Sequence, residues 1–230
     1  DLARKEAQAR HLAYHDGLTG LPNRNLLQDR FQQAMSQAER HRKPLALLMI
    51  DLDEFKRVND KLGHASGDKL LQAVAVRLTK GIRGADTACR YGGDEFVIML
   101  PEIDSPNIAT ALAMEIGARL SEPYIIDGHK IHTAVSVGVS VYPGDGRTLD
   151  DLMKQADIAM YVAKQPGHKR IAVYGEDTDS SAQTLVASRE TSALFQALAQ
   201  PEMVEMHYQP IHNLPQRQVV YYEALARIRH

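Results

Sequence analysis

Apolar and polar positions along the chain repeat with helical and strand periods, and the two kinds of segment follow one another. The segment 44–51 is continuously apolar and ends in carboxylates, which predicts a strand that delivers acids to a site. Helices are predicted over 25–40, 55–62, 67–80, 107–120 and 149–164, and strands over 87–91, 96–100, 124–126, 129–142 and 170–174. The pattern therefore predicts a domain of mixed helix and strand.

The order of the main elements, additions aside, is β-α-β-β-α-β. This order predicts an α+β fold with a ferredoxin-like βαββαβ core. We expect a central, mostly antiparallel sheet flanked by helices, with the helices on one face. Many unrelated functions use this arrangement, so the function has to come from the site.

Composition changes divide the chain into four parts. Residues 1–15 are rich in Ala, Gln, Arg and Glu and predict an exposed linker helix that can pair with its own copy. The globular domain is expected over 16–175, followed over 176–200 by a polar linker with a helix at 182–199. Two short apolar strands in 201–230 are too small to bury a core alone.

Charge and cysteine content exclude several classes of function. The 27 Lys and Arg against 29 Asp and Glu leave a net charge of −2, which provides no general field for a nucleic-acid polymer or an anionic membrane. Cys89 is the only cysteine, so we expect a small buried hydrophobe and no disulfide. The apolar run 45–50 is too short to cross a bilayer. We expect a cytoplasmic protein, and a longer, membrane-anchored parent stays open.

Two pairs of acids stand at the ends of predicted strands. Asp51 and Asp53 follow the strand 44–51, and Asp94 and Glu95 lie in the turn of the hairpin 87–100. Converging carboxylates suit Mg²⁺, which takes the rest of its ligands from waters and substrate phosphates. Simple solvation is the alternative for either pair alone, but the glycines beside Asp94 would let a bulky ligand approach the backbone.

The segment between these pairs contains groups suited to a nucleotide. Lys56, near the start of a predicted helix, offers a cation to a triphosphate. Asn59 and Asp68 offer an amide and a carboxylate that match the donors and acceptors of a guanine edge. Both residue types are also common helix caps, which is the alternative interpretation.

Together these residues resemble the GGDEF family of diguanylate cyclases, over roughly 16–174. So many matched positions make chance agreement very unlikely. The matching motifs are Asp16-Gly17-Leu18-Thr19-Gly20-Leu21-Pro22-Asn23-Arg24, Asp51-Leu52-Asp53-Glu54-Phe55-Lys56, Asn59-Asp60, His64, Gly67-Asp68, Gly92-Gly93-Asp94-Glu95-Phe96 and Ala156-Asp157-Ile158-Ala159-Met160-Tyr161-Val162-Ala163-Lys164.

The resemblance implies a reaction in which two GTP molecules become cyclic di-GMP and two pyrophosphates. It implies two Mg²⁺ or Mn²⁺ ions per site, and a homodimer in which each domain holds one GTP. Asp94 would accept the proton of the attacking 3′-hydroxyl, with Glu95 as alternative or helper. Asp51, Asp94 and the Leu52 carbonyl would hold metal, and GTP would meet Phe55, Lys56, Asn59, His64, Asp68, Gly92, Gly93 and Lys164.

One position departs from the family at the phosphate end. Where the family often has Gly-Arg-Asn, this chain has Gly167-His168-Lys169, so a titratable side chain replaces a fixed charge. Lys169 is the candidate to compensate. We expect weaker or pH-sensitive triphosphate binding, and no loss of function.

Arg83 and Asp86 stand at the spacing of the family's product-inhibition site, where cyclic di-GMP would bind. A plain surface ion pair is the alternative. The second arginine of that site is not obvious, because Glu115 and Gly117 lie where it is expected. Inhibition is therefore expected to be weak.

The C-terminal segment resembles the beginning of an EAL phosphodiesterase domain, through Tyr208-Gln209-Pro210 and Glu223-Ala224-Leu225-Ala226-Arg227. Glu223 would bind metal in the complete domain, but no phosphodiesterase activity is expected from this chain. The parent is expected to carry an N-terminal sensor and a complete EAL domain.

The alternatives to an active cyclase are a weakly active GTP-sensing domain that regulates the phosphodiesterase, a cyclic di-GMP receptor and a dimerising scaffold.

Overall fold

The structure is a computed structural model, and it describes residues 11–165, 169–178, 204–213 and 218–228. The chain divides into two compact units, residues 1–182 and 183–230. No helix in the described ranges has the length and apolar character needed to cross a membrane. The predicted helix 182–199 and most of the predicted helix 1–15 lie outside the described residues, and residues 11–14 are helical.

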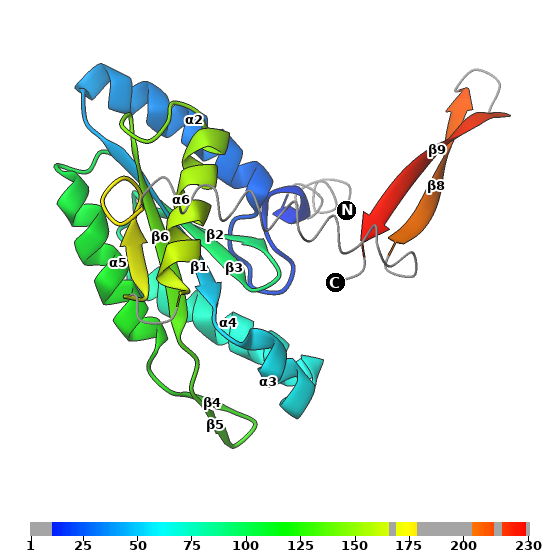
Figure 1. Ribbon diagram of the computed structural model, residues 1–230, viewed down its shortest axis with the longest axis horizontal. Coiled ribbons are helices and arrows are strands. Elements are labelled where there is room, and N and C mark those ends of the chain that lie inside the picture. Colours follow the sequence, from blue (N-terminus) through cyan, green and yellow to red (C-terminus); the bar gives the residue numbers. More distant parts are fainter. Residues whose placement is uncertain (1–10, 166–168, 179–203, 214–217, 229–230) are drawn as a thin grey trace, which may run out of the picture. The chain divides into compact units, whose positions relative to one another are not determined.

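A five-stranded mixed sheet forms the centre of the first unit, in the order β2-β3-β1-β6-β7 (Figure 1). Neighbouring strands are antiparallel except for β6 and β7, which are parallel. The α+β fold with its mostly antiparallel sheet is therefore confirmed. The strands are β1 (Leu45–Leu52), β2 (Thr87–Gly92), β3 (Glu95–Leu100), β6 (Val135–Tyr142) and β7 (Ile171–Val173).

Helices cover both faces of this sheet, so the prediction that they lie on one face is wrong. On one face α4 (His64–Lys80) and α5 (Pro106–Leu120) pack on alternate residues of β1, among them Leu48. On the other face α2 (Arg24–His41) and α6 (Leu149–Ala163) pack on the residues between them, among them Leu47. An unbroken apolar run is what a strand buried on both faces requires.

Several element boundaries differ from the predicted ones. Helix α3 (Phe55–Leu62) lies as predicted, but α4 follows directly at His64, three residues before the expected start. The predicted strand 129–142 is interrupted: β4 (Tyr124–Ile126) and β5 (His129–Ile131) form a separate hairpin. The interruption has a clear cause, since Thr133 and Ala134 hydrogen-bond to the backbone of Asp53 after β1.

The second unit contains an antiparallel pair of strands, β8 (Val204–Asn213) and β9 (Gln218–Ile228). Gln209 is the register partner of Glu223 in this pair. The two strands predicted for this segment are therefore present, in longer form.

Candidate functional site

The two predicted acid pairs lie together at one end of the central strands. Asp51, near the end of β1, is the register partner of Glu95, the first residue of β3. Asp94 precedes Glu95 in the turn between β2 and β3. The strand order therefore brings carboxylates from two separate segments to one place, as the sequence predicted.

Burial and mutual repulsion act on these carboxylates. Burial raises the pKa of Asp51; an ion pair with Lys164 opposes this, and Asp94 and Asp53 raise it further. Burial also raises the pKa of Glu95, with contributions from the neighbouring charges of Asp51, Asp157 and Asp94. The site therefore contains more negative charge than its cations neutralise.

Lys164, which is predicted to contact phosphate, is ion-paired with an acid. It is the C-cap residue of α6, and its Nζ lies 2.9 Å from Asp51 Oδ1. The helix thus delivers a cation to the carboxylate that was predicted to bind metal.

The donor chemistry fits a magnesium ion that shares its ligands with a substrate. In the described ranges no three His, Cys, Asp or Glu side chains are grouped to hold a metal by themselves. Asp51, Asp94 and the carbonyl of buried Leu52 offer hard oxygen donors, and burial together with the nearby charges of Asp94 and Asp53 raises the pKa of Asp51. Mg²⁺ commonly uses one or two carboxylates and completes its shell with water and phosphate.

A cavity of about 480 Å³ opens beside these acids. It combines three carboxylates with two fixed cations and a histidine, a mixture that suits a metal-bound polyphosphate. Its lining residues are Asp51, Asp53, Glu54, His132, Thr133, Ala134, Lys164 and Arg170. Lys56 and Lys169 are exposed and line neither this cavity nor a neighbouring one of about 310 Å³ between α3 and β5.

Asn59 occupies the contact between α3 and α4. Its Oδ1 atom is buried and has no hydrogen-bond partner, and a Cβ on Gly67 would lie 1.9 Å from it. Asn59 lies inside α3 and Asp68 inside α4, so neither caps a helix and the capping alternative is wrong. A buried acceptor without a partner is costly unless a ligand supplies the donor, which is what a guanine edge offers.

Gly92 and Gly93, in the signature turn between β2 and β3, are each required by the local structure. A Cβ on Gly92 would lie 2.8 Å from Arg24 Nη2, and Gly93 has a positive φ of 46°. Gly92 therefore makes room for an arginine and Gly93 permits the turn. The sequence argument, which used both glycines to admit a ligand, missed these roles.

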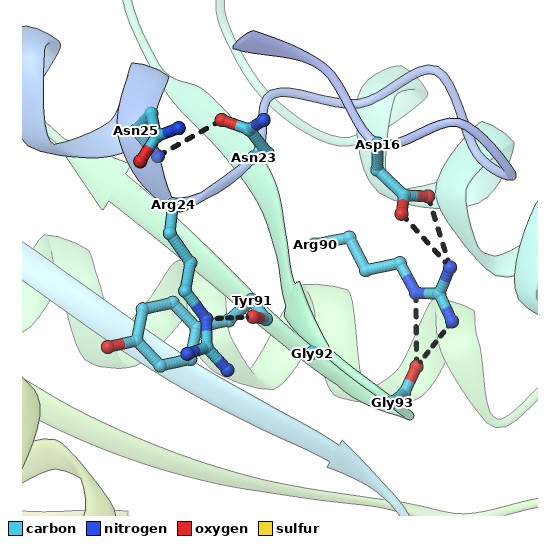
Figure 2. A pocket seen from close by; sticks show the side chains of 8 residues that line it. All are labelled: Asp16, Asn23, Arg24, Asn25, Arg90, Tyr91, Gly92 and Gly93. Atoms are coloured by element: carbon cyan, nitrogen blue, oxygen red, sulfur yellow. Dashed lines mark hydrogen bonds and ion pairs between the residues drawn. The ribbon is translucent and has the colours of Figure 1, made fainter. Parts of the chain in front are cut away.

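Two arginines hold the turn in place, as Figure 2 shows. Arg24 donates from Nε to the Tyr91 carbonyl, and its guanidinium lies 4.2 Å from the centre of the Tyr91 ring. Arg90 pairs with Asp16 at 3.1 Å and donates to the Gly93 carbonyl from Nε at 3.0 Å and Nη2 at 2.8 Å. The opening motif 16–24 therefore supports the turn that carries Asp94.

This support reaches back to the N-terminal helix. Asn23 and Asn25 donate from their side chains to the Ala13 carbonyl, at 3.0 and 3.1 Å. The sequence identified the segment 16–24 as a motif shared with the family, but nothing in a one-dimensional pattern pairs Asp16 with Arg90.

Arg83 and Asp86, the residues predicted to bind product, form an ion pair with each other, as the alternative interpretation expected. Asp86 Oδ2 accepts from the Arg83 backbone N–H at 2.8 Å, and Asp86 Oδ1 lies 3.0 Å from Arg83 Nη2. The Asp86 side chain is fully buried, whereas that of Arg83 is 59% exposed. Asp86 therefore has a structural role, and Arg83 presents its guanidinium to solvent.

Arg119, two residues after Gly117, is a candidate for the second arginine of the predicted product-inhibition site. Arg119 pairs with Glu115 at 2.7 Å, and a Cβ on Gly81 would lie 2.4 Å from Arg119 Nη1. Arg119 thus packs over the start of the segment that carries Arg83. His168 lies outside the described residues.

Comparisons with known proteins agree with this geometry. Residues 13–170 match the family described as diguanylate cyclase, GGDEF domain. The chain is 42% identical over 229 residues to the bifunctional diguanylate cyclase/cyclic di-GMP phosphodiesterase MucR of Pseudomonas aeruginosa, covering all of this chain and 33% of MucR. It thus spans about a third of the length of that relative.

Two solved structures resemble the first unit. The GGDEF domain of TpbB from Pseudomonas aeruginosa matches with a TM-score of 0.69 and 36% identity, over 75% of this chain and 99% of that one. DgcB from Caulobacter crescentus, solved with its coiled coil and in complex with c-di-GMP, matches with a TM-score of 0.67 and 29% identity, over 75% and 91% of the two chains. The chain belongs to the GGDEF diguanylate cyclase family.

Proposed function

We infer that this chain condenses two GTP molecules into one cyclic di-GMP and two pyrophosphates. The observation that carries this inference is the register of β1 and β3, which places Asp51 opposite Glu95 and beside Asp94. A cavity with Lys164 and Arg170 opens at the same place, and Asn59 offers an unpartnered buried acceptor for a base. Phosphoryl transfer depends mainly on such positioning and charge neutralisation.

In each half of the reaction the 3′-oxygen of one GTP forms a bond to the α-phosphorus of the other. The bond between that phosphorus and the bridging oxygen breaks, and pyrophosphate leaves with the electron pair. Asp94 is proposed to take the hydroxyl proton, with Glu95 as helper, because both carboxylates lie beside Asp51 at the end of the central strands. Burial raises the pKa of Glu95, so this carboxyl group binds a proton more readily.

Asp51, Asp94 and the Leu52 carbonyl are the proposed ligands of two Mg²⁺ or Mn²⁺ ions, which would supply positive charge to the attacking and leaving oxygens. Phe55, Lys56, His64 and Asp68 stay proposed GTP contacts, as do Gly92, Gly93 and Lys164. His64 and Asp68 are exposed on the first turns of α4, next to Asn59.

Two GTP molecules have to meet, and each domain carries one such site. We therefore propose a homodimer with two-fold symmetry, in which the two cavities face each other. Cyclic di-GMP is the proposed ligand of Arg83, with Arg119 as a second guanidinium nearby. Cytoplasmic location and an EAL domain beginning within 201–230 stay proposals of the same kind.

A GTP-sensing role within a larger phosphodiesterase is the second candidate. It is favoured by a second relative, the cyclic di-GMP phosphodiesterase NbdA of Pseudomonas aeruginosa, which is 36% identical over 227 residues and whose name gives phosphodiesterase activity only. In that role the chain would bind GTP and turn it over slowly or not at all.

Incubation of the purified chain with GTP and Mg²⁺, followed by chromatography of the nucleotides, separates the two candidates. Cyclic di-GMP should form with the wild type and should vanish with Asp94→Asn. Asp29→Asn, at an exposed position of α2, is the matched control and should retain activity. GTP binding without product in the wild type would instead support the sensor.

A further inference from the structure

Arg170 stands at the entrance of the candidate triphosphate cavity. It directly precedes β7, and its backbone carbonyl accepts a hydrogen bond from the Val137 N–H at 2.9 Å. This bond ties the residue to β6, so the side chain starts from a fixed point of the sheet. Its guanidinium lines the cavity of about 480 Å³ together with Lys164.

Asp53 holds one side of this guanidinium. Its Oδ2 atom is ion-paired with Arg170 Nη1, and its Oδ1 atom accepts from Ser136 Oγ at 2.9 Å. The Asp53 backbone N–H donates to the Ala134 carbonyl at 2.9 Å, and its own carbonyl accepts from Thr133 Oγ1 at 3.0 Å. Asp53 is therefore fixed by both its side chain and its backbone.

The Arg170 side chain is 59% exposed even though its partner is only 13% exposed. Such half-exposed ion pairs contribute little to stability, so the pair is not explained as a fold-stabilising contact. An arginine has five N–H donors, and within the described part of the chain Asp53 engages it through Nη1. A guanidinium oriented in this way can still bind phosphate oxygens bidentately.

Lys164 and Arg170 make parallel contacts in the cavity. Lys164 pairs with Asp51 and Arg170 pairs with Asp53, the two acids that flank Leu52. The cavity thus presents two cations side by side, as a chain of phosphates requires. Lys169, the residue that the sequence suggested as a replacement for the usual arginine, does not line this cavity.

We propose that Arg170 binds the β- and γ-phosphates of the nucleotide and that Asp53 is its positioning residue. This inference deepens the proposed function and rests on it, since it assumes that the cavity receives the triphosphate. Arg170 then supplies the fixed charge that the family usually places at the position of His168.

Calorimetric titration with a GTP analogue whose α- and β-phosphates are joined by a methylene group tests the proposal, because this analogue cannot release pyrophosphate. In Mg²⁺, Arg170→Gln should weaken binding of the analogue about tenfold or more, the effect of losing a charged hydrogen bond. GMP, which lacks the β- and γ-phosphates, should bind wild type and variant equally. Arg170→Lys, which keeps the charge but not the fork, should lie between them.

Arg147→Gln is the matched control, because Arg147 is exposed and lines none of the cavities described above. Equal melting temperatures of wild type and Arg170→Gln would show that the variant is folded. Unchanged analogue affinity in Arg170→Gln, or a loss that appears only in Lys169→Gln, overturns the proposal. Equal weakening of GMP and analogue also overturns it, because the effect would then not concern the outer phosphates.

The outcome for Arg170 is separable from the outcome for the cyclase. Suppose that the wild type binds the analogue, that Arg170→Gln does not, and that the wild type makes no cyclic di-GMP. The phosphate site is then supported and the proposed reaction fails. If cyclic di-GMP forms and Arg170→Gln binds normally, the reaction stands and the phosphate site fails. If the wild type does not bind the analogue at all, both fail.

Discussion

At the scale of single residues, folding buries acids of the site whose charged forms are better solvated in water. Asp51 is ionised at neutral pH in water, but burial raises its pKa in the folded chain even though Lys164 is its partner. The carboxylate is therefore disfavoured by folding when no metal is present. Function and stability conflict at this position, as is common where charges are gathered for a ligand.

Asp51→Asn should consequently raise the melting temperature at pH 7 in the presence of a chelator. A group whose pKa is raised by folding favours the folded state below its unfolded pKa and loses this contribution as pH rises through the folded value. The advantage of Asp51→Asn should therefore shrink as pH falls toward 4. Circular dichroism melts between pH 4 and 8 measure it.

Asp151 provides a comparison of opposite sign. Its hydrogen bond with Thr148 lowers its pKa in the capping box of α6, so its ionised form stabilises the fold above its usual pKa and loses this effect as pH falls. Asp151→Asn should lower the melting temperature at pH 7. A lower melting temperature for Asp51→Asn at pH 7 would contradict the account of the site.

At the scale of elements, the proposed nucleotide site depends on a close approach of two helices. Helix α4 begins directly after α3, and the pair is packed so tightly at Gly67 that Asn59 fills the place of a Cβ. A similar approach occurs where a Cβ on Gly138 of β6 would lie 1.9 Å from the Ala156 carbonyl of α6. Helical and strand periods predict neither contact.

Gly67→Ala should therefore displace Asn59 and weaken nucleotide binding. Overpacking of this kind typically costs about 1–3 kcal/mol of stability. Urea unfolding gives the loss of stability, and titration with GMP gives the loss of affinity. Gly17→Ala is the control, because a Cβ there would meet no atom within 4 Å, and an undisturbed GMP affinity in Gly67→Ala would refute the role of Asn59.

The sequence predicted most elements but not their ends. Gly63 joins α3 and α4 with a φ of 83°, so one residue makes a turn where a longer loop was expected. The predicted strand 129–142 breaks because Thr133 and Ala134 bond to Asp53, 80 positions away along the chain for the Thr133 bond. Both outcomes depend on contacts that lie outside the window of a periodicity argument.

At the scale of the whole molecule, the proposed reaction requires two chains. In the proposed reaction the cavity of each chain receives the triphosphate of one GTP, so a second chain would have to bring the second GTP. The clamp formed by Arg24 and Arg90 joins the signature turn to the segment next to the N-terminal helix. Pairing of that helix with a second copy would therefore act close to the site.

Cyclase activity per chain should rise with protein concentration and level off once the dimer is saturated. Initial rates over a hundredfold range of concentration, compared with the sedimentation of the same samples, measure this dependence. Addition of excess Asp94→Asn chain to a dilute wild type should reduce the rate per wild-type chain when mixed dimers replace active ones. A constant specific activity in samples that sediment as monomers would rule out the dimer.

The sequence by itself determined the order of elements, the acids at the strand ends, the buried Cys89 and the family. These follow from neighbours along the chain, where periodicity and motif spacing have a direct physical meaning. Only the tertiary structure decided which cation faces the cavity, because Arg170 and Asp53 are 117 positions apart and meet through the sheet order. It likewise decided that Gly92 makes room for Arg24, since that contact joins the first residue of α2 to the last residue of β2.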